Sequence, residues 1–336
     1  MGVEKGFWNK LSVPTVGMAP MDGVTDAACR WIAKRHGQAD VVYTEFVSAE
    51  GLWRINKRQE FDHKIWKELR FSKEESPVVV QLFGSDPKSF YDATMIVGKM
   101  GFDGIDINMG CPSPGLEKSG GGAGLIRVPE CAGNVVAEVR RAVGDLGLNL
   151  PVSVKTRIGS SVPEPDWWDF LASLELPVVA MHGRTFKQLY SGEADWEVLS
   201  EAARVIRKSG ALFLANGDVK GVKIDGREWK AKLNSGKEVS GEPFDGVLVG
   251  RNVVGNPWVL RKDGLVPNLK QRLEVAVEQA RAYEKLFPGD KFFPVRKHLA
   301  GFVSGVENAG ELRRKLVMTL AMGQLRGAWP IALPPR

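Results

Sequence analysis

Cysteine and histidine are scarce in this chain of 336 residues, which contains three cysteines and four histidines. The cysteines, Cys29, Cys111 and Cys131, form no C-x-x-C pair, so neither a disulfide framework nor a cysteine-bound zinc site is indicated. The few histidines likewise give no metal-ligand pattern, and we expect no metal. Three unpaired thiols favour a reducing compartment, and we expect the cytoplasm.

Long apolar segments are also missing. No segment approaches the roughly 20 apolar residues that a membrane-spanning helix requires. The first ten residues, MGVEKGFWNK, lack the apolar core of a secretory signal peptide. With 43% hydrophobic and 26% charged residues, the composition is typical of a globular protein with a sizeable core, and we expect no membrane partner.

Net charge is distributed unevenly along the chain. Residues 262–336 contain 13 Lys and Arg against 7 Asp and Glu, which accounts for the whole excess of +6. Residues 1–261 are balanced, with 33 basic and 33 acidic side chains. A positive charge concentrated in one part of a protein can bind a polyanion, so the C-terminal segment is the candidate nucleic-acid-binding region.

Short apolar segments rich in Val and Ile recur along the chain, and amphipathic segments with helical periodicity lie between most of them. Segments that are apolar on both faces are typical of buried parallel strands. We expect strands at residues 16–20, 40–47, 77–84, 102–108, 151–159, 177–185, 211–219 and 244–253. Helices are expected at residues 25–36, 86–100, 129–143 and 196–208. Eight such units predict an α/β fold, a (β/α)8 TIM barrel; a doubly wound sheet is the alternative, but no G-x-G-x-x-G follows the first strand.

Two regions depart from this alternation. Residues 219–243 are polar and Gly-rich, and we interpret them as an expanded loop with a hairpin at 222–228 and a short helical segment near 227–233. After residue 257 the pattern is helical. Helices are expected at residues 269–286, 295–303 and 309–322. These features predict a catalytic barrel domain at 1–260 and a basic, all-helical domain at 261–336.

The carboxyl ends of the strands are where a (β/α)8 barrel carries its catalytic groups. The residues there are varied and lack the carboxylate pair of a glycosidase. They are Pro20, Met21, Glu45, Gln81, Asn108, Cys111, Lys155, Arg157, His182, Arg184, Asn216, Gly217, Asp218, Gly250 and Arg251. Two Gly-containing turns, NGD at 216–218 and GRN at 250–252, follow the last two strands, where this fold binds phosphate. We therefore expect a cofactor or substrate that carries a phosphate group.

Cys111 lies between Gly110 and Pro112, in a turn that follows an apolar strand segment. An exposed thiol is a chemical liability unless its reactivity is used. The Gly-rich segment at 112–124 could close over a bound ligand. An inert thiol is the alternative for Cys111, whereas Cys29 and Cys131 lie in helical patterns and are expected to pack in the core.

Eight short segments occur in a fixed order. They are APMDGVTD (19–26), VQLFG (80–84), NMGCP (108–112), VKTRIG (154–159), MHGRT (181–185), ANGD (215–218), GRNVVGNPW (250–258) and RKHL (296–299). In order and spacing they resemble the tRNA-dihydrouridine synthase family, over about residues 13–322. Two features depart from the family pattern: Asp22 stands where many members have Ala, and the loop at 219–243 is longer than usual.

The resemblance implies a barrel that binds FMN, a helical tRNA-binding domain, and reduction of the C5=C6 bond of particular uridines in tRNA with NADPH or NADH. The implied flavin-binding residues are Pro20, Met21, Asp22, Gln81, Lys155, His182, Asn216, Gly217, Asp218, Gly250 and Arg251, of which the last five hold the phosphate. In the implied reaction, hydride would pass from N5 of the flavin to C6 of the base, and Cys111 would supply the proton to C5. A lysine ammonium suits the negative charge near N1 of a reduced flavin.

Substrate contacts are assigned to Asn108, Arg157, Arg184, Arg296 and Lys297. Alternatives remain, because Asn108 could instead cap the turn, and Arg157 and Arg184 could be structural ion-pair partners. The basic segment near 312–316 is assigned to RNA, with an ordinary solvated helix face as the alternative.

Two rival functions remain open at this stage. One is a small-molecule FMN oxidoreductase of the dihydroorotate or dihydropyrimidine dehydrogenase type, which would not need the basic helical region. The other is an RNA-binding protein without catalysis. Nothing in the sequence requires an obligate protein partner, so we expect a monomer, and the sequence does not reveal which uridine is modified.

Overall fold

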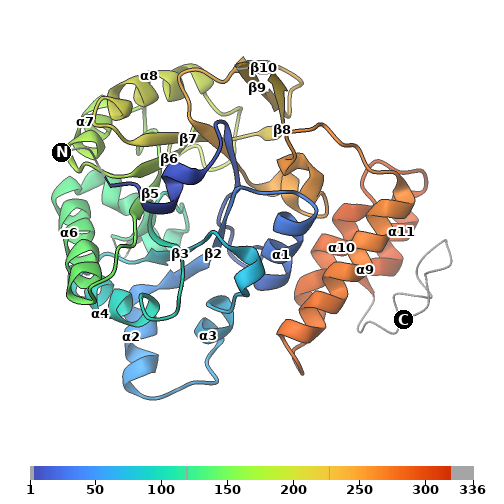
Figure 1. Ribbon diagram of the computed structural model, residues 1–336, viewed down its shortest axis with the longest axis horizontal. Coiled ribbons are helices and arrows are strands. Elements are labelled where there is room, and N and C mark those ends of the chain that lie inside the picture. Colours follow the sequence, from blue (N-terminus) through green and yellow to red (C-terminus); the bar gives the residue numbers. More distant parts are fainter. Residues whose placement is uncertain (1–3, 119, 227, 319–336) are drawn as a thin grey trace.

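The computed structural model describes residues 4–118, 120–226 and 228–318. Its centre is a closed barrel of parallel strands in the order β1-β11-β7-β6-β5-β4-β3-β2 (Figure 1). The strands are β1 (Thr15–Met18), β2 (Val41–Ser48), β3 (Val78–Phe83), β4 (Gly104–Met109), β5 (Val152–Arg157), β6 (Val178–His182), β7 (Leu212–Asn216) and β11 (Gly246–Val249). Each coincides with a predicted strand, and the predicted TIM barrel is confirmed.

Helices of the barrel domain surround these strands and cover them with apolar side chains. They are α1 (Ala27–Arg35), α2 (Ala49–Lys57), α3 (Lys64–Glu68), α4 (Pro87–Val97), α5 (Pro114–Lys118), α6 (Pro129–Asp145), α7 (Pro165–Ser173) and α8 (Trp196–Arg207). Local signals start several of them. Asp26 caps α1 by accepting from Cys29 N, and Asp195 caps α8 by accepting from Glu197 N and Val198 N. Proline occupies the first turn of α4, α6 and α7, where its missing N–H costs no hydrogen bond.

A small antiparallel sheet replaces a helix between β7 and β11. It consists of β8 (Val219–Asp225), β9 (Glu228–Leu233) and β10 (Glu238–Ser240), in the order β10-β9-β8. The predicted hairpin is confirmed: Asp225 pairs with Glu228, and Gly226 has a φ of +60°. The predicted helical segment near 227–233 is wrong, because β9 alternates buried Trp229, Ala231 and Leu233 with exposed residues, which is the period of a strand. Residue 227 lies outside the described residues.

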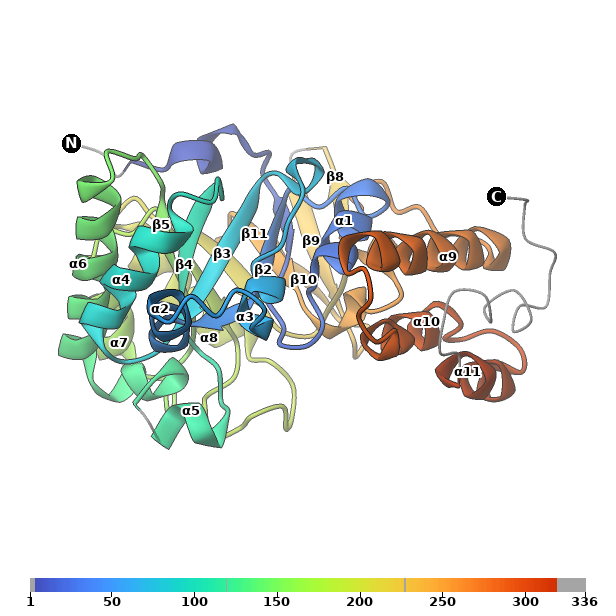
Figure 2. The ribbon, with the colours of Figure 1, turned by 90° about the horizontal axis from the view of Figure 1, so that it is seen from below.

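The C-terminal segment is helical, as predicted. It contains α9 (Leu269–Leu286), α10 (Arg296–Phe302) and α11 (Ala309–Val317), which lie beside the barrel (Figure 2). Residues 319–322 of the last predicted helix, and the end of the predicted domain at 319–336, lie outside the described residues. Apolar residues of α9 and α10, among them Leu273 and Leu299, pack with Ala28 and Ile32 of α1. The boundary at residue 260 stays a prediction.

No helix within the described ranges is both long and apolar enough to span a membrane.

Candidate active site at the carboxyl ends of the barrel strands

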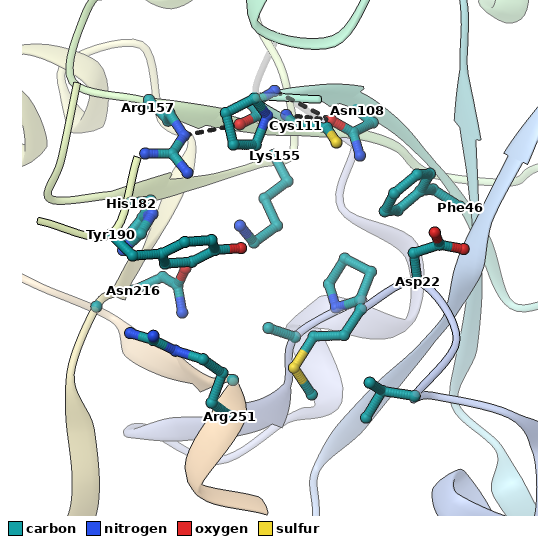
Figure 3. Close-up of a pocket in the computed structure, with 18 of the residues that line it drawn as sticks. Asp22, Phe46, Asn108, Cys111, Lys155, Arg157, His182, Tyr190, Asn216 and Arg251 are labelled. Carbon is teal, nitrogen blue, oxygen red and sulfur yellow. Dashed lines mark hydrogen bonds between the residues drawn. The ribbon is translucent and has the colours of Figure 1, made fainter. Parts of the chain in front are cut away.

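A cavity of about 810 Å³ opens where the barrel strands end (Figure 3). It is lined by side chains from the carboxyl-terminal parts of the strands and from the turns that follow them. The lining includes every residue predicted to be catalytic or cofactor-binding: Pro20, Met21, Asp22, Gln81, Cys111, Lys155, His182, Asn216, Gly217, Asp218, Gly250 and Arg251. Parallel strands bring their carboxyl ends together at one end of a barrel, so residues far apart in sequence meet here.

Asn108 shapes the turn that carries Cys111. Its Oδ1 atom accepts hydrogen bonds from the backbone N–H of Gly110 (3.1 Å) and of Cys111 (2.8 Å). Its Nδ2 atom donates to Gln81 Oε1 at 3.0 Å. Asn108 therefore caps the turn, which was the alternative that the sequence left open to a substrate contact. Although Asn108 also lines the cavity, its polar atoms are engaged by the protein itself.

The thiol of Cys111 is half-buried at the cavity wall. Burial raises its pKa above the usual 9.0, and the neighbouring Ser113 N–H and Arg157 only partly offset this effect. The sulfur is therefore protonated at neutral pH, as a proton donor must be. Ala123 N donates to the Cys111 carbonyl at 3.1 Å, which ties the turn to the end of the Gly-rich segment.

Arg157 holds two loops of the cavity wall in place. Its Nε atom donates to the Gly110 carbonyl at 2.7 Å, next to Cys111. Its Nη1 atom donates to the carbonyls of Thr185 (2.9 Å) and Leu189 (3.0 Å) in the loop after β6. These donors bind the protein's own backbone, which gives most of the N–H groups of Arg157 a structural role. Arg157 also lines the cavity, and its substrate contact stays a prediction.

Positive charge is concentrated on one side of the cavity. Burial and the nearby Arg157 lower the pKa of Lys155, whose side chain extends into the cavity (Figure 3), to about 8. Burial together with Lys155, Arg157 and two further arginines lowers the pKa of His182 well below its usual value. Arg184 Nη1 lies 3.2 Å from His182 Nε2. Because a guanidinium can only donate, Nε2 accepts this hydrogen bond and carries no proton, so the imidazole is neutral. The wall suits an anionic group.

The two Gly-containing turns form a cradle at the predicted phosphate site. Gly217 has a φ of +132°, and a Cβ atom there would lie 2.5 Å from Ala194 Cβ, so only glycine fits. The backbone N–H groups of Gly217, Asp218 and Arg251 donate to no described residue. The Asn216 side chain is used otherwise, because its Nδ2 atom donates to the Leu248 carbonyl at 2.7 Å.

Three predicted substrate contacts lie outside the cavity lining. Arg184 is 2% exposed and donates to Asp218 Oδ2 at 2.6 Å, so its position does not support a substrate contact. Asp218 Oδ2 also accepts from Ala194 N, and the Asp218 carboxylate is therefore a partner of the protein rather than of a phosphate. Arg296 and Lys297 lie on α10. A Cβ atom on Gly23 would be 3.5 Å from Lys297 Nζ, which places Lys297 beside the rim.

Sequence reasoning missed Tyr190, which projects into the cavity from the loop after β6 (Figure 3). Tyr190 is 56% exposed. An exposed aromatic residue in a polar loop after a strand was the available signal. Phe46 of β2 and Asn234, in the turn after β9, also line the cavity and were not predicted. Within residues 4–118, 120–226 and 228–318, no group of three His, Cys, Asp or Glu residues could hold a metal ion.

Comparisons with known proteins identify the family of this chain. The family model described as dihydrouridine synthase matches residues 17–325. The probable tRNA-dihydrouridine synthase of Staphylococcus aureus (strain MRSA252) is 31% identical over 331 residues, which cover 96% of this chain and 94% of that protein. The probable tRNA-dihydrouridine synthase 2 of Bacillus subtilis (strain 168) is 30% identical over 339 residues, covering 96% and 95%.

Among solved structures, morphinone reductase matches with a TM-score of 0.44 and 13% identity, over 74% of this chain and 85% of that one. The sequence relatives are far more similar, and they match over nearly their whole length. This chain belongs to the dihydrouridine synthase family, a family of flavin oxidoreductases.

Proposed function

We propose that this protein reduces uridines in tRNA to 5,6-dihydrouridine, with FMN as the bound cofactor and NADPH or NADH as the reductant. The observation that carries the proposal is a protonated cysteine, Cys111, at the wall of a cation-lined cavity in a chain of this family. The relatives' names specify tRNA as their substrate. We place the reaction in the cytoplasm and expect a monomer.

The cavity offers suitable partners for FMN. Gly217, Asp218 and Arg251 present backbone N–H groups without described acceptors, and the Arg251 side chain adds a positive charge for the phosphate. Lys155 extends its ammonium group into the cavity (Figure 3). A positive charge there suits the negative charge of a reduced flavin ring. When bound, FMN supplies the hydride that is added to the base.

Cys111 is proposed to supply the second hydrogen. Because burial keeps its thiol protonated at neutral pH, the Sγ–H bond can break toward C5 of the base and leave a thiolate. The lowering effect of Arg157 on the pKa of Cys111 favours that thiolate. The thiolate then regains a proton from solvent before the next turnover.

The helical segment is proposed to hold the tRNA. A base inside a stack cannot reach a barrel cavity, so the target uridine has to be extruded or unstacked. Lys297 lies beside the cavity rim, and Arg296 precedes it on α10, where both can contact the RNA backbone near the extruded nucleotide. We retain residues 1–260 as the catalytic domain and residues 261–336 as the tRNA-binding domain.

The test is the Cys111→Ala variant of the holoenzyme. We expect flavin content, flavin reduction by NADPH and tRNA affinity to be retained, and dihydrouridine formation to fall by about 10²-fold or more, the usual contribution of a general acid. Cys131→Ala is the matched control, because Cys131 is a half-buried thiol on α6 outside the cavity lining. Unchanged turnover in Cys111→Ala would refute the acid role. Reduction of a free pyrimidine with no activity on tRNA would favour the small-molecule flavoenzyme instead.

A further inference from the structure

We propose that Asp106 is a positioning residue that sets the orientation of a buried hydrogen-bond relay, Asp106–Gln81–Asn108, which holds the backbone turn of Cys111. The catalytic consequence rests on the proposed function of Cys111, whereas the relay itself rests on geometry. No prediction from the sequence assigned a role to Asp106.

The relay begins with a carboxylate inside the barrel. Asp106 lies on β4 and is completely buried. Its Oδ2 atom accepts from Gln81 Nε2 at 2.7 Å, and its Oδ1 atom accepts from Ser153 Oγ at 2.6 Å. Strand register explains these contacts, because Asp106 pairs with Gln81 of β3 on one side and with Ser153 of β5 on the other.

The carboxylate determines how each following amide is turned. An ionised carboxylate can only accept, so Gln81 must present its Nε2 atom to Asp106 and its Oε1 atom to Asn108. Asn108 must then present Nδ2 to Gln81, at 3.0 Å, and Oδ1 to the turn. In this orientation Oδ1 accepts from the N–H groups of Gly110 and Cys111. A reversed Asn108 amide would place a donor against two donors.

If Asp106 only filled space, dihydrouridine formation would not depend on which side chains of the relay donate and which accept. The relay predicts such a dependence, because turning the amide of Gln81 or Asn108 round would place donor against donor or acceptor against acceptor. Asp106 and Asn108 do not bond to each other, so any coupling between them that depends on donor direction passes through Gln81.

The experiment reverses the relay. Asn108→Asp places a carboxylate at each end of Gln81, so one of them faces Gln81 Oε1, and we expect dihydrouridine formation to fall about tenfold or more. In Asp106→Asn/Asn108→Asp, the new amide at position 106 donates to Gln81 Oε1, Gln81 Nε2 donates to the new carboxylate at position 108, and the turn keeps its acceptor. We expect this double variant to regain about fivefold or more of the lost turnover, within the range of measured coupling between neighbouring residues.

Asp106→Ala/Asn108→Asp separates the relay from simple charge repulsion. It also removes the second carboxylate but offers no donor to Gln81, so the relay predicts little recovery. Equal recovery in the two double variants would overturn the relay, as would no recovery in either. This comparison does not require Asn108→Asp itself to be stable. Ser153→Ala, which removes the other hydrogen bond to Asp106, is the control and is expected to stay within about threefold of the parent.

Two further measurements assign the effect to Cys111. Dihydrouridine formation is compared at equal FMN content and after complete flavin reduction by NADPH, because the variants also turn the amide of Gln81, which lines the cavity. The rate of Cys111 alkylation by iodoacetamide, measured in a Cys131→Ala background, is expected to change in Asn108→Asp and to return to the parent's rate in Asp106→Asn/Asn108→Asp. If Cys111→Ala is inactive and the double variants do not differ, the relay is wrong and the proposed function stands. If Cys111→Ala is fully active, the proposed function fails independently.

Discussion

The guanidinium carbon of Arg251 lies 4.5 Å from the centroid of the Tyr190 ring. The two side chains come from different loops, Tyr190 from the loop after β6 and Arg251 from the turn after β11, and both line the cavity (Figure 3). Arg251 is also 3.8 Å from Asp218 Oδ1 and stays largely exposed. The guanidinium of Arg251 therefore contacts the face of an aromatic ring as well as lying beside the proposed phosphate site.

Arg251→Ala is expected to weaken FMN binding by about tenfold or more, because a charged hydrogen bond to a phosphate contributes roughly 1.5–3 kcal/mol. Arg251→Lys retains the charge and is expected to lose less. The measurement is the fraction of FMN retained after dialysis, together with a titration of the apoprotein. Full retention in Arg251→Ala would count against the cradle as the phosphate site.

Tyr190→Ala is expected to raise KM for tRNA more than it changes flavin reduction by NADPH, because the ring provides a planar surface in the cavity for an unstacked base. A base stacked on an aromatic side chain contributes roughly 1–3 kcal/mol, which corresponds to an increase of about 5-fold to 150-fold. Tyr190→Phe keeps the ring and is expected to lose less. Phe61→Ala, an exposed aromatic residue outside the lining, is the control. Equal effects of the Tyr190 and Phe61 variants would argue against the stacking surface.

The affinity of the apoprotein for FMN is expected to decrease as the pH rises through about 8. The pKa of Lys155 is lowered to about 8, so its ammonium is present below that pH and is lost above it. An anionic ligand therefore binds better on the acid side of this value. Lys155→Met removes the titrating group, and the decrease in affinity between pH 7 and 9 should disappear. Titrations that give parallel pH profiles for the two proteins would contradict this assignment.

Neutralising Arg313 and Arg314 is expected to weaken tRNA binding and to make it less sensitive to salt. Both side chains are exposed on α11; the side chain of Lys315, which belongs to the same predicted basic segment, lies outside the described residues. Each lost phosphate contact should reduce the slope of log K against log salt by about 0.7–0.9.

The control for this measurement is the exchange of Lys99 and Lys208 for Gln. These exposed lysines follow the carboxyl ends of α4 and α8, at the end of the barrel opposite the cavity. We expect them to leave the salt dependence unchanged. A slope that responds equally to both pairs of substitutions would move the RNA-binding surface away from α11.

Residue patterns alone identified the eight barrel strands and most residues of the cavity. This was possible because a strand buried on both faces has to be continuously apolar, and because parallel strands place their carboxyl ends together. Gln81, Lys155 and His182 could therefore be grouped without any knowledge of distances. The small sheet between β7 and β11 was only half predicted, since a short segment such as 228–233 carries both helix-forming lysines and the alternation of a strand.

Which atom bonds to which was decided by packing between distant segments. Arg184 and Asn108 are polar residues at strand ends like Lys155, yet Arg184 turns inward to Asp218 and Asn108 turns to the Cys111 backbone. Asp106 faces Gln81 and Ser153 because of the register of three neighbouring strands. Local periodicity specifies the side of a strand on which a residue lies. Whether a hydrogen bond forms depends on the distance between atoms of segments far apart in the chain, and a difference of a few tenths of an ångström matters.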